Sequence, residues 1–256
     1  MNESIIESLN IGRGSFVSVI GAGGKSTLLH HLAMECVSIG FRVLTSSTTN
    51  MQPPPPQETD EFIVRQPGEN ILDRLCRSFE NHQHVTAAGA SVPSSDPSGI
   101  ENRRDKIRGF EPEELDSIHE HGPQDILLIQ ADGARRRSFK APAAHEPRVP
   151  SSTTHCILAV GLDALGAPLD SEKVHRHEIT AALAEQEIGS EVTIETILKV
   201  SQHPDGYLPH LPSNARRILY LSKADTTQRI DSAKLIQATI DPENYDLVFW
   251  ADLPGD

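Results

Sequence analysis

Short apolar runs alternate along this chain with longer segments in which apolar residues recur at helical spacing. The runs typical of buried strands lie at 16–20, 41–45, 84–88, 125–131, 156–160, 217–221 and 246–253. Helical spacing is found at 25–38 and 71–79, from 112, from about 175, at 192–201 and in a segment ending at 240. Buried strands that alternate with helices predict a three-layer α/β fold, with a mainly parallel sheet and helices on both faces.

We expect the whole chain, residues 1–256, to form one P-loop NTPase-like domain. A long irregular segment is expected at 133–152 and a helical insertion at about 175–202. Segment 89–99 is rich in Ser, Pro and Gly and is predicted to be a loop. In sheets of this kind ligands bind beyond the carboxyl ends of the strands, where the candidate motifs lie.

The composition argues against several classes of protein. A net charge of −13 disfavours a general nucleic-acid binder, because phosphate backbones attract a positive surface. No apolar run approaches the roughly 20 residues that cross a bilayer. The first residues lack the basic start and the apolar centre of a secretion signal. Three cysteines far apart, with no C-x-x-C pair, indicate reduced thiols. We therefore expect a cytoplasmic protein that binds neither nucleic acid nor membrane.

A glycine-rich loop follows the first apolar run. The usual phosphate-binding pattern is G-x-x-x-x-G-K-[ST], and Val19 stands where its first glycine belongs. A dinucleotide-binding G-x-G-x-x-G is disfavoured, because Ser26 replaces its third glycine and no acidic residue follows about 20 positions later. In the phosphate-loop interpretation, backbone N–H groups surround phosphate oxygens, Lys25 reaches the terminal phosphates and Ser26 ligates Mg²⁺. The predicted nucleotide contacts are Gly21, Ala22, Gly23, Gly24, Lys25, Ser26 and Thr27.

Two further motifs stand after later strands. Asp132 follows the run DILLIQA and is placed to hold Mg²⁺ or its waters. Lys25 and Asp132 are thus the predicted catalytic residues, and Ser26 and Asp132 the predicted metal ligands. Lys223 and Asp225 match the base-reading N-K-x-D pattern apart from a serine in its first position, and such a carboxylate favours GTP over ATP. The alternative interpretations are an ordinary Asp-Gly turn and a helix cap at Asp225.

Cations and histidines between these motifs have no settled role. The basic run of Arg135, Arg136, Arg137 and Lys140 could hold substrate phosphates or an anionic cofactor, or it could be a solvated loop. No spacing among the histidines is typical of a metal site, which favours surface histidines. The candidate anion or substrate contacts are Arg135, Arg136, Lys140, His145, His175 and Arg176.

Taken in order, these motifs resemble the YqeC-type family of selenium-dependent hydroxylase accessory proteins. The shared elements are VIGAGGKSTLL, TSSTTN, QADGARR, KAP, HEPRVP, VGLDALGAPL, VHR and LSKAD, and they extend from about residue 15 to about residue 250. The family loop is normally G-x-G-G-K-[ST], which accounts for the missing first glycine. The resemblance implies a P-loop NTPase-like protein that binds Mg²⁺ and GTP or ATP. It also implies a role in maturing selenium-dependent molybdenum hydroxylases, with the hydroxylase or its cofactor as partner.

Three positions depart from the family pattern. Gln130 replaces the usual glutamate before Ala-Asp-Gly, Asn50 replaces a histidine and His177 replaces a proline. Because the lost glutamate affects hydrolysis more than binding, we expect nucleotide binding with slow or partner-stimulated turnover. One alternative is a kinase or nucleotidyl transferase acting on a small phosphorylated molecule or the molybdenum cofactor. The other is a non-catalytic docking module gated by nucleotide.

Overall fold

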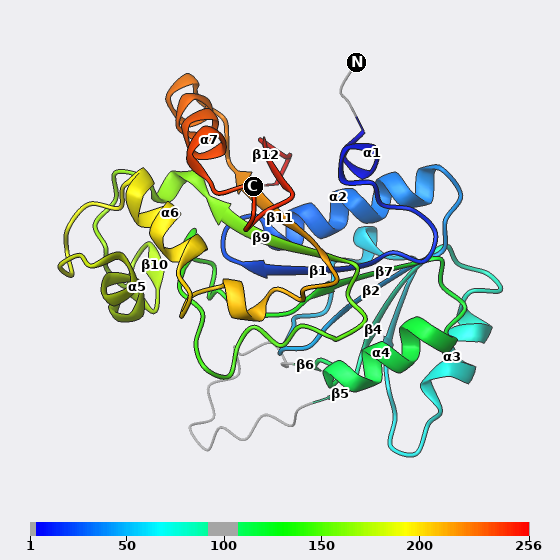
Figure 1. Cartoon of the computed structure of the whole chain (residues 1–256). Coiled ribbons are helices and arrows are strands. Elements are labelled where there is room, and N and C mark those ends of the chain that lie inside the picture. Colours follow the sequence, from blue (N-terminus) through cyan, green and yellow to red (C-terminus); the bar gives the residue numbers. More distant parts are fainter. Residues whose placement is uncertain (1–3, 92–106, 256) are drawn as a thin grey trace. The chain divides into compact units, whose positions relative to one another are not determined.

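The main sheet of the protein has eight strands. The computed structural model describes residues 4–91 and 107–255 (Figure 1). The strand order is β12 (Leu247–Ala251), β11 (Arg216–Ser222), β9 (His155–Gly161), β1 (Phe16–Gly21), β7 (Ile126–Gln130), β2 (Val43–Ser47), β4 (His84–Ala88) and β3 (Glu61–Val64). The pairs β12–β11, β11–β9, β7–β2, β2–β4 and β4–β3 are parallel. With the helices around the sheet this is a three-layer α/β arrangement, which confirms the predicted fold class.

The helices follow the predicted apolar spacing closely, although α1 and strand β3 were not predicted. They are α1 (Ile5–Leu9), α2 (Lys25–Ser38), α3 (Ile71–Ser78), α4 (Pro112–His121), α5 (His177–Ala184), α6 (Ile194–Gln202) and α7 (Thr227–Thr239). The single-turn 3₁₀ helices are η1 (Pro56–Glu58), η2 (Leu162–Ala164) and η3 (Leu208–His210). The two short strand pairs are antiparallel β5 (Ala90–Ser91) with β6 (Ile107–Arg108), and parallel β8 (Phe139–Lys140) with β10 (Val174–His175). Most of the predicted loop at 89–99 lies outside the described residues.

Side chains at the helix starts explain where several helices begin. Asn70 accepts a hydrogen bond from the Leu72 N–H at the start of α3. Thr226 accepts one from the Arg229 N–H and is the N-cap of α7. Such caps satisfy N–H groups that have no partner within the helix. The alternative interpretation of Asp225 as the cap of this helix is therefore wrong, because Thr226 occupies that position.

The residues group into two compact units, which we describe separately. Unit 1 comprises residues 1–17, 29–130 and 150–152, and unit 2 comprises 18–28, 131–149 and 153–256. Segment 133–152 is irregular apart from β8, and the predicted helical insertion contains α5 and α6, which contact each other within unit 2 (Figure 1). The single-domain organisation stays a prediction. In the described ranges no helix has the length and apolar character needed to cross a membrane.

Candidate functional site

The glycine-rich loop joins β1 to α2 within unit 2. Its glycines Gly21, Gly23 and Gly24 have φ values of +89°, +78° and +67°, a backbone region that disfavours other residues. A Cβ atom on Gly21 would lie 2.3 Å from the carbonyl oxygen of Ala159, and one on Gly23 would lie 2.5 Å from the backbone nitrogen of Gly161. Gly21 and Gly23 therefore allow the loop backbone to pack closely against the end of β9.

Three backbone N–H groups at the start of the loop donate to acceptors within unit 2. Gly21 donates to Asp132 Oδ2 at 2.9 Å, Ala22 to the Ala159 carbonyl at 2.9 Å, and Gly23 to the Arg137 carbonyl at 3.1 Å. Helix α2 begins four residues after Gly21, and the first N–H groups of a helix have no partner inside it and attract anions. The arrangement thus favours phosphate at the second half of the predicted contact segment, residues 24–27, over its first half.

A buried ion cluster lies directly beside this loop. The ammonium group of Lys25 is 3.0 Å from Asp132 Oδ1 and donates to the Gly21 carbonyl at 2.5 Å. Lys140 approaches the other oxygen of Asp132, Oδ2, at 2.8 Å, and the side chains of Asp132 and Lys140 are completely buried. Burial lowers the pKa of Lys25, while the charge of Asp132 acts in the opposite direction. The structure thus brings together both predicted catalytic residues, Lys25 and Asp132.

The surroundings of Asp132 bear on its predicted role as a metal ligand. Its carboxylate contacts two ammonium groups and the Gly21 N–H, so a Mg²⁺ ion bound directly to it would displace one of these partners. Mg²⁺ often keeps several waters and is held largely by substrate phosphates. Among the described residues, no group of three or more His, Cys, Asp or Glu side chains is arranged to hold a metal. The residues therefore fit an ion carried mainly by phosphates, which the exposed Ser26 would contact.

The predicted substrate contacts fall into two classes in the structure. Lys140 also donates to the Gly133 carbonyl at 2.8 Å and lies 3.5 Å from Glu146. The same Glu146 accepts a hydrogen bond from Arg176 at 2.7 Å. Lys140 and Arg176 are thus committed to internal acids, whereas Arg135, Arg136 and His145 are exposed.

His175 lies in β10, which pairs in register with β8 so that His175 is opposite Lys140. Burial lowers the pKa of His175 to about 4, and the positive charges of Arg176, Lys140 and Arg135 act in the same direction. The imidazole is therefore neutral at pH 7. A neutral imidazole can donate one hydrogen bond to an anionic ligand without adding a positive charge.

Two residues of this region, Tyr207 and His210, were not predicted from the sequence. The Tyr207 hydroxyl donates to the Lys140 carbonyl at 3.2 Å and is buried. Burial also lowers the pKa of His210, and the nearby charges of Asp132 and Lys140 act on it in opposite directions. Their segment, HPDGYLPHLP, carries turn signals but no recognised motif.

A second polar cluster connects the segment after β7 with the carboxyl ends of β9 and β11. Ser138 donates to Asp163 Oδ2 at 2.8 Å, and the Lys223 ammonium group lies 3.2 Å from the same oxygen. Burial alone would raise the pKa of Asp163, but the Ser138 hydrogen bond and the Lys223 charge hold it below its usual value. Asp163 was not predicted, although it follows a buried strand within VGLDALGAPL. Asp225 is exposed and pairs with Arg229 at 2.6 Å, and its role in base recognition stays a prediction.

The hydroxyl-rich run TSSTTN belongs to unit 1. Ser46 donates to the Ala87 carbonyl at 2.8 Å, and Ser47 donates to the Gln130 carbonyl at 2.9 Å. A Cβ atom on Gly109 would lie 2.1 Å from the Ser47 carbonyl oxygen. Within unit 1 these two serine hydroxyls therefore stabilise the ends of neighbouring strands.

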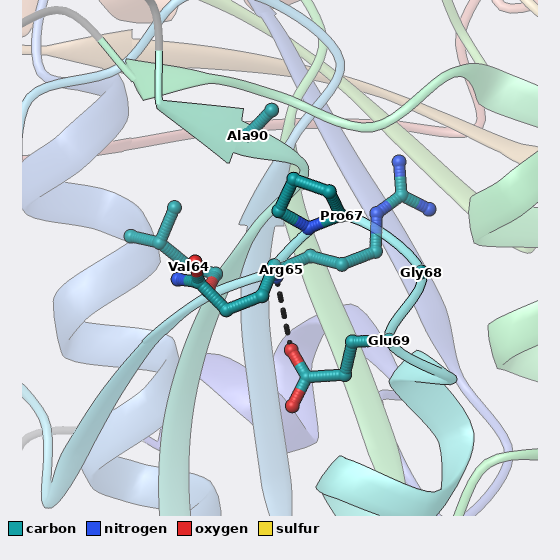
Figure 2. Close-up of a pocket in the computed structure, with 7 residues that line it drawn as sticks. Val64, Arg65, Pro67, Gly68, Glu69 and Ala90 are labelled. Atoms are coloured by element: carbon teal, nitrogen blue, oxygen red, sulfur yellow. Dashed lines mark hydrogen bonds between the residues drawn. The ribbon is translucent and has the colours of Figure 1, made fainter.

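Two pockets formed by described residues lie away from the predicted site. The first, about 420 Å³, lies in unit 1 around the turn after β3 (Figure 2). Two of its charged side chains already have partners: Arg65 binds Glu114, and Glu69 accepts from the Gln66 N–H. The second, about 500 Å³, lies in unit 2 beside the start of α7. The phosphate loop lines neither of these two pockets.

Comparison with known proteins adds a family relationship. A family model described as "YqeC protein" matches residues 17–178. The chain is 30% identical over 226 residues to the uncharacterized protein YqeC of Escherichia coli strain K12, which covers 88% of this chain and 82% of the relative. No solved structure matches the chain.

Proposed function

The chain belongs to the YqeC family, and on that premise we propose that it binds a magnesium nucleoside triphosphate, GTP in preference to ATP, on the β1–α2 loop. We further propose that it serves, in the cytoplasm, the maturation of selenium-dependent molybdenum hydroxylases. The observation that carries the binding proposal is the buried Lys25, held by Asp132 where helix α2 begins.

The charges around the loop support an anionic ligand. Two carboxylates, those of Asp132 and Glu146, face three cations, Lys25, Lys140 and Arg176. The N–H groups of a helix start add partial positive charge. The phosphate of a bound nucleotide supplies the negative charge that this cluster lacks. Ser26 is exposed at the start of α2, where a Mg²⁺ ion held by the phosphates can reach it.

The proposed preference for GTP depends on the segment after β11. Lys223 is anchored to Asp163 and Ser138, while the Asp225 carboxylate is exposed. Guanine offers two hydrogen-bond donors to such a carboxylate, and adenine lacks the ring N–H. A bound base that covers this carboxylate and displaces Arg229 must supply such donors, and a base that lacks them is disfavoured.

Slow turnover is part of the proposal. Gln130 supplies no carboxylate to activate water, and Asp132 is occupied by two lysines and a backbone N–H. The role in hydroxylase maturation is supported by the motifs shared with the YqeC-type accessory proteins. Free thiols at Cys36, Cys76 and Cys156 agree with the proposed cytoplasmic location.

A thermal-shift comparison tests nucleotide binding. Mg-GTP at about 100 times its dissociation constant should stabilise the protein by roughly 2.7 kcal/mol. Mg-ATP should stabilise it less, and omission of the metal should weaken the effect of both nucleotides. The absence of any shift with either nucleotide would refute the phosphate-loop assignment.

Product analysis separates the catalytic alternatives. With γ-labelled GTP, slow release of free phosphate indicates hydrolysis, whereas a labelled acceptor indicates a kinase. A nucleotidyl transferase releases pyrophosphate instead, and a docking module leaves the nucleotide intact. Rapid hydrolysis by the purified protein alone would contradict slow turnover.

Complementation tests the proposed client. In a host that makes a selenium-dependent molybdenum hydroxylase, deletion of the corresponding gene should lower hydroxylase activity per unit of hydroxylase polypeptide. The wild-type chain should restore that activity and the Lys25→Ala variant should not. Normal hydroxylase activity in the deletion strain would refute the role.

A further inference from the structure

A turn with three consecutive arginines connects the Asp132 segment to β8. In this arginine turn, residues 134–137, the Arg137 N–H donates to the Ala134 carbonyl at 2.9 Å. Arg135 and Arg136 have φ values of +48° and +60°, a left-handed region that residues other than glycine rarely adopt. These two residues thus have an uncommon backbone conformation, in a turn that is hydrogen-bonded to the phosphate loop.

The arginine turn is attached directly to that loop. The Arg137 carbonyl accepts the Gly23 N–H at 3.1 Å, and the next carbonyl, that of Ser138, accepts the Gly161 N–H at 2.8 Å. The Ser138 hydroxyl binds Asp163, which also holds Lys223. The turn is therefore fixed between the phosphate loop on one side and the polar cluster of Asp163 on the other.

Arg135 and Arg136 differ in their partners from four cations near the phosphate loop and the Asp163 cluster. Lys25, Lys140, Arg176 and Lys223 each contact an internal carboxylate. Arg135 and Arg136 are exposed, and within residues 4–91 and 107–255 neither pairs with an acid. This is notable in a chain with a net charge of −13, where acids outnumber Lys and Arg by 36 to 23.

The charge of Arg135 extends toward the cluster around Lys140. It acts on His175 together with Arg176 and Lys140, and all three disfavour the charged imidazole. Arg135 therefore adds to the positive potential over the buried lysines. A ligand with one phosphate at Lys25 would meet this potential with its outer phosphates.

We propose that Arg135 and Arg136 contact the outermost phosphate of a polyphosphate whose next phosphate lies at Lys25, so that the site selects triphosphates over diphosphates and single phosphates. This inference rests on the proposed function and specifies its ligand class. Arginine suits the role because its planar group binds two phosphate oxygens at once.

Calorimetric titration with inorganic phosphate, pyrophosphate and tripolyphosphate tests the inference without involving a base. The proteins are the wild type, an Arg135→Gln/Arg136→Gln variant and a matched control, Arg77→Gln, which removes an exposed arginine of α3 in unit 1. The double variant should bind tripolyphosphate at least about tenfold more weakly, and inorganic phosphate within about twofold of the wild type. The control should match the wild type for all three anions. An Arg135→Lys/Arg136→Lys variant, which keeps both charges, should recover part of the lost affinity.

Each outcome is decisive. Unchanged tripolyphosphate affinity in the double variant, or an equal loss for all three anions, overturns the inference.

A parallel titration with GTP separates the arginine inference from the proposed function. If the wild type binds tripolyphosphate through these arginines but does not bind GTP, the nucleotide proposal fails alone. If GTP binds equally well to wild type and double variant, the arginine inference fails alone. A wild type that binds neither GTP nor tripolyphosphate overturns both.

Discussion

The side-chain nitrogen of Lys140 lies 2.8 Å from Asp132 Oδ2, and neither side chain is exposed to solvent. Lys25 approaches the other carboxylate oxygen at 3.0 Å. Buried charges are costly unless they are paired. Asp132 and Glu146 together face three cations, Lys25, Lys140 and Arg176, which leaves one positive charge in excess. That excess supports the proposed anionic ligand.

Replacement of Lys140 should destabilise the protein. Lys140→Met removes a buried ammonium group and leaves Asp132 and Glu146 without one of their partners. Removal of one member of a buried ion pair costs about 3–5 kcal/mol of unfolding free energy. Urea denaturation measures this cost. The control is Lys234→Met, because the Lys234–Asp231 pair is exposed and should contribute little. A loss of stability no larger than that of the control would contradict the buried network.

The phosphate loop should not tolerate a side chain at Gly23. In Gly23→Ala the new Cβ would meet the Gly161 nitrogen at 2.5 Å, and the positive φ adds strain of about 1–3 kcal/mol. We expect lower stability and loss of nucleotide binding. Gly12→Ala is the matched control, because a Cβ atom on Gly12 would have no neighbour within 4 Å and its φ is not positive. Equal stability of the two variants in urea would show that the loop is packed differently.

Much of the fold could be predicted because continuous apolar runs identify central strands in any context. Strand β3 was missed because only Ile63 within it is buried, so its pattern is weak. The two-residue strands β8 and β10 exist through their pairing with each other, a contact between residues distant in sequence. Local sequence carries no signal for such a contact.

The candidate site could be predicted only in part. The glycines and Lys25 were predicted from a shortened phosphate-loop pattern, and Asp132 from its place after a buried strand. The structure brings the two charged residues together. The contact of Lys140 with Asp132 depends on how the irregular segment folds back, which no spacing rule describes. Asp163 was missed for a similar reason, since its partners Ser138 and Lys223 come from distant segments.

The free energy of unfolding should fall as the pH drops from about 6.5 to about 4. Burial lowers the pKa of His84 to about 4; the charge of Asp60 opposes this shift and that of His30 adds to it. The unfolded chain therefore takes up a proton in this range that the folded chain does not, at a cost on the order of 3 kcal/mol. His175, whose pKa burial also lowers to about 4, contributes in the same direction.

Denaturation curves between pH 4 and pH 7 measure this dependence. His84→Asn should lose less stability on acidification than the wild type, although it also lacks the hydrogen bond with Thr45. His145→Asn, which replaces an exposed imidazole, should run parallel to the wild type. A pH dependence that is unchanged in His84→Asn would contradict a buried neutral His84.

Base preference should depend on Asp225. Asp225→Ala removes the proposed acceptor for guanine and should lower the ratio of GTP affinity to ATP affinity at least about tenfold. Competition titrations measure this ratio. Arg229→Gln is the control, because it breaks the same surface ion pair but keeps the carboxylate. An unchanged ratio in Asp225→Ala would remove the guanine assignment.

The most direct test of the central claim is a calorimetric titration of Mg-GTP into the wild type, Lys25→Ala and Lys234→Ala. We expect a single site in the wild type, no detectable site in Lys25→Ala, and an unaltered site in Lys234→Ala, whose lysine is exposed on α7. Circular dichroism would confirm that each variant is folded. Undiminished binding of Mg-GTP by folded Lys25→Ala, or no binding by the wild type, would contradict the assignment of a nucleotide phosphate site to the β1–α2 loop.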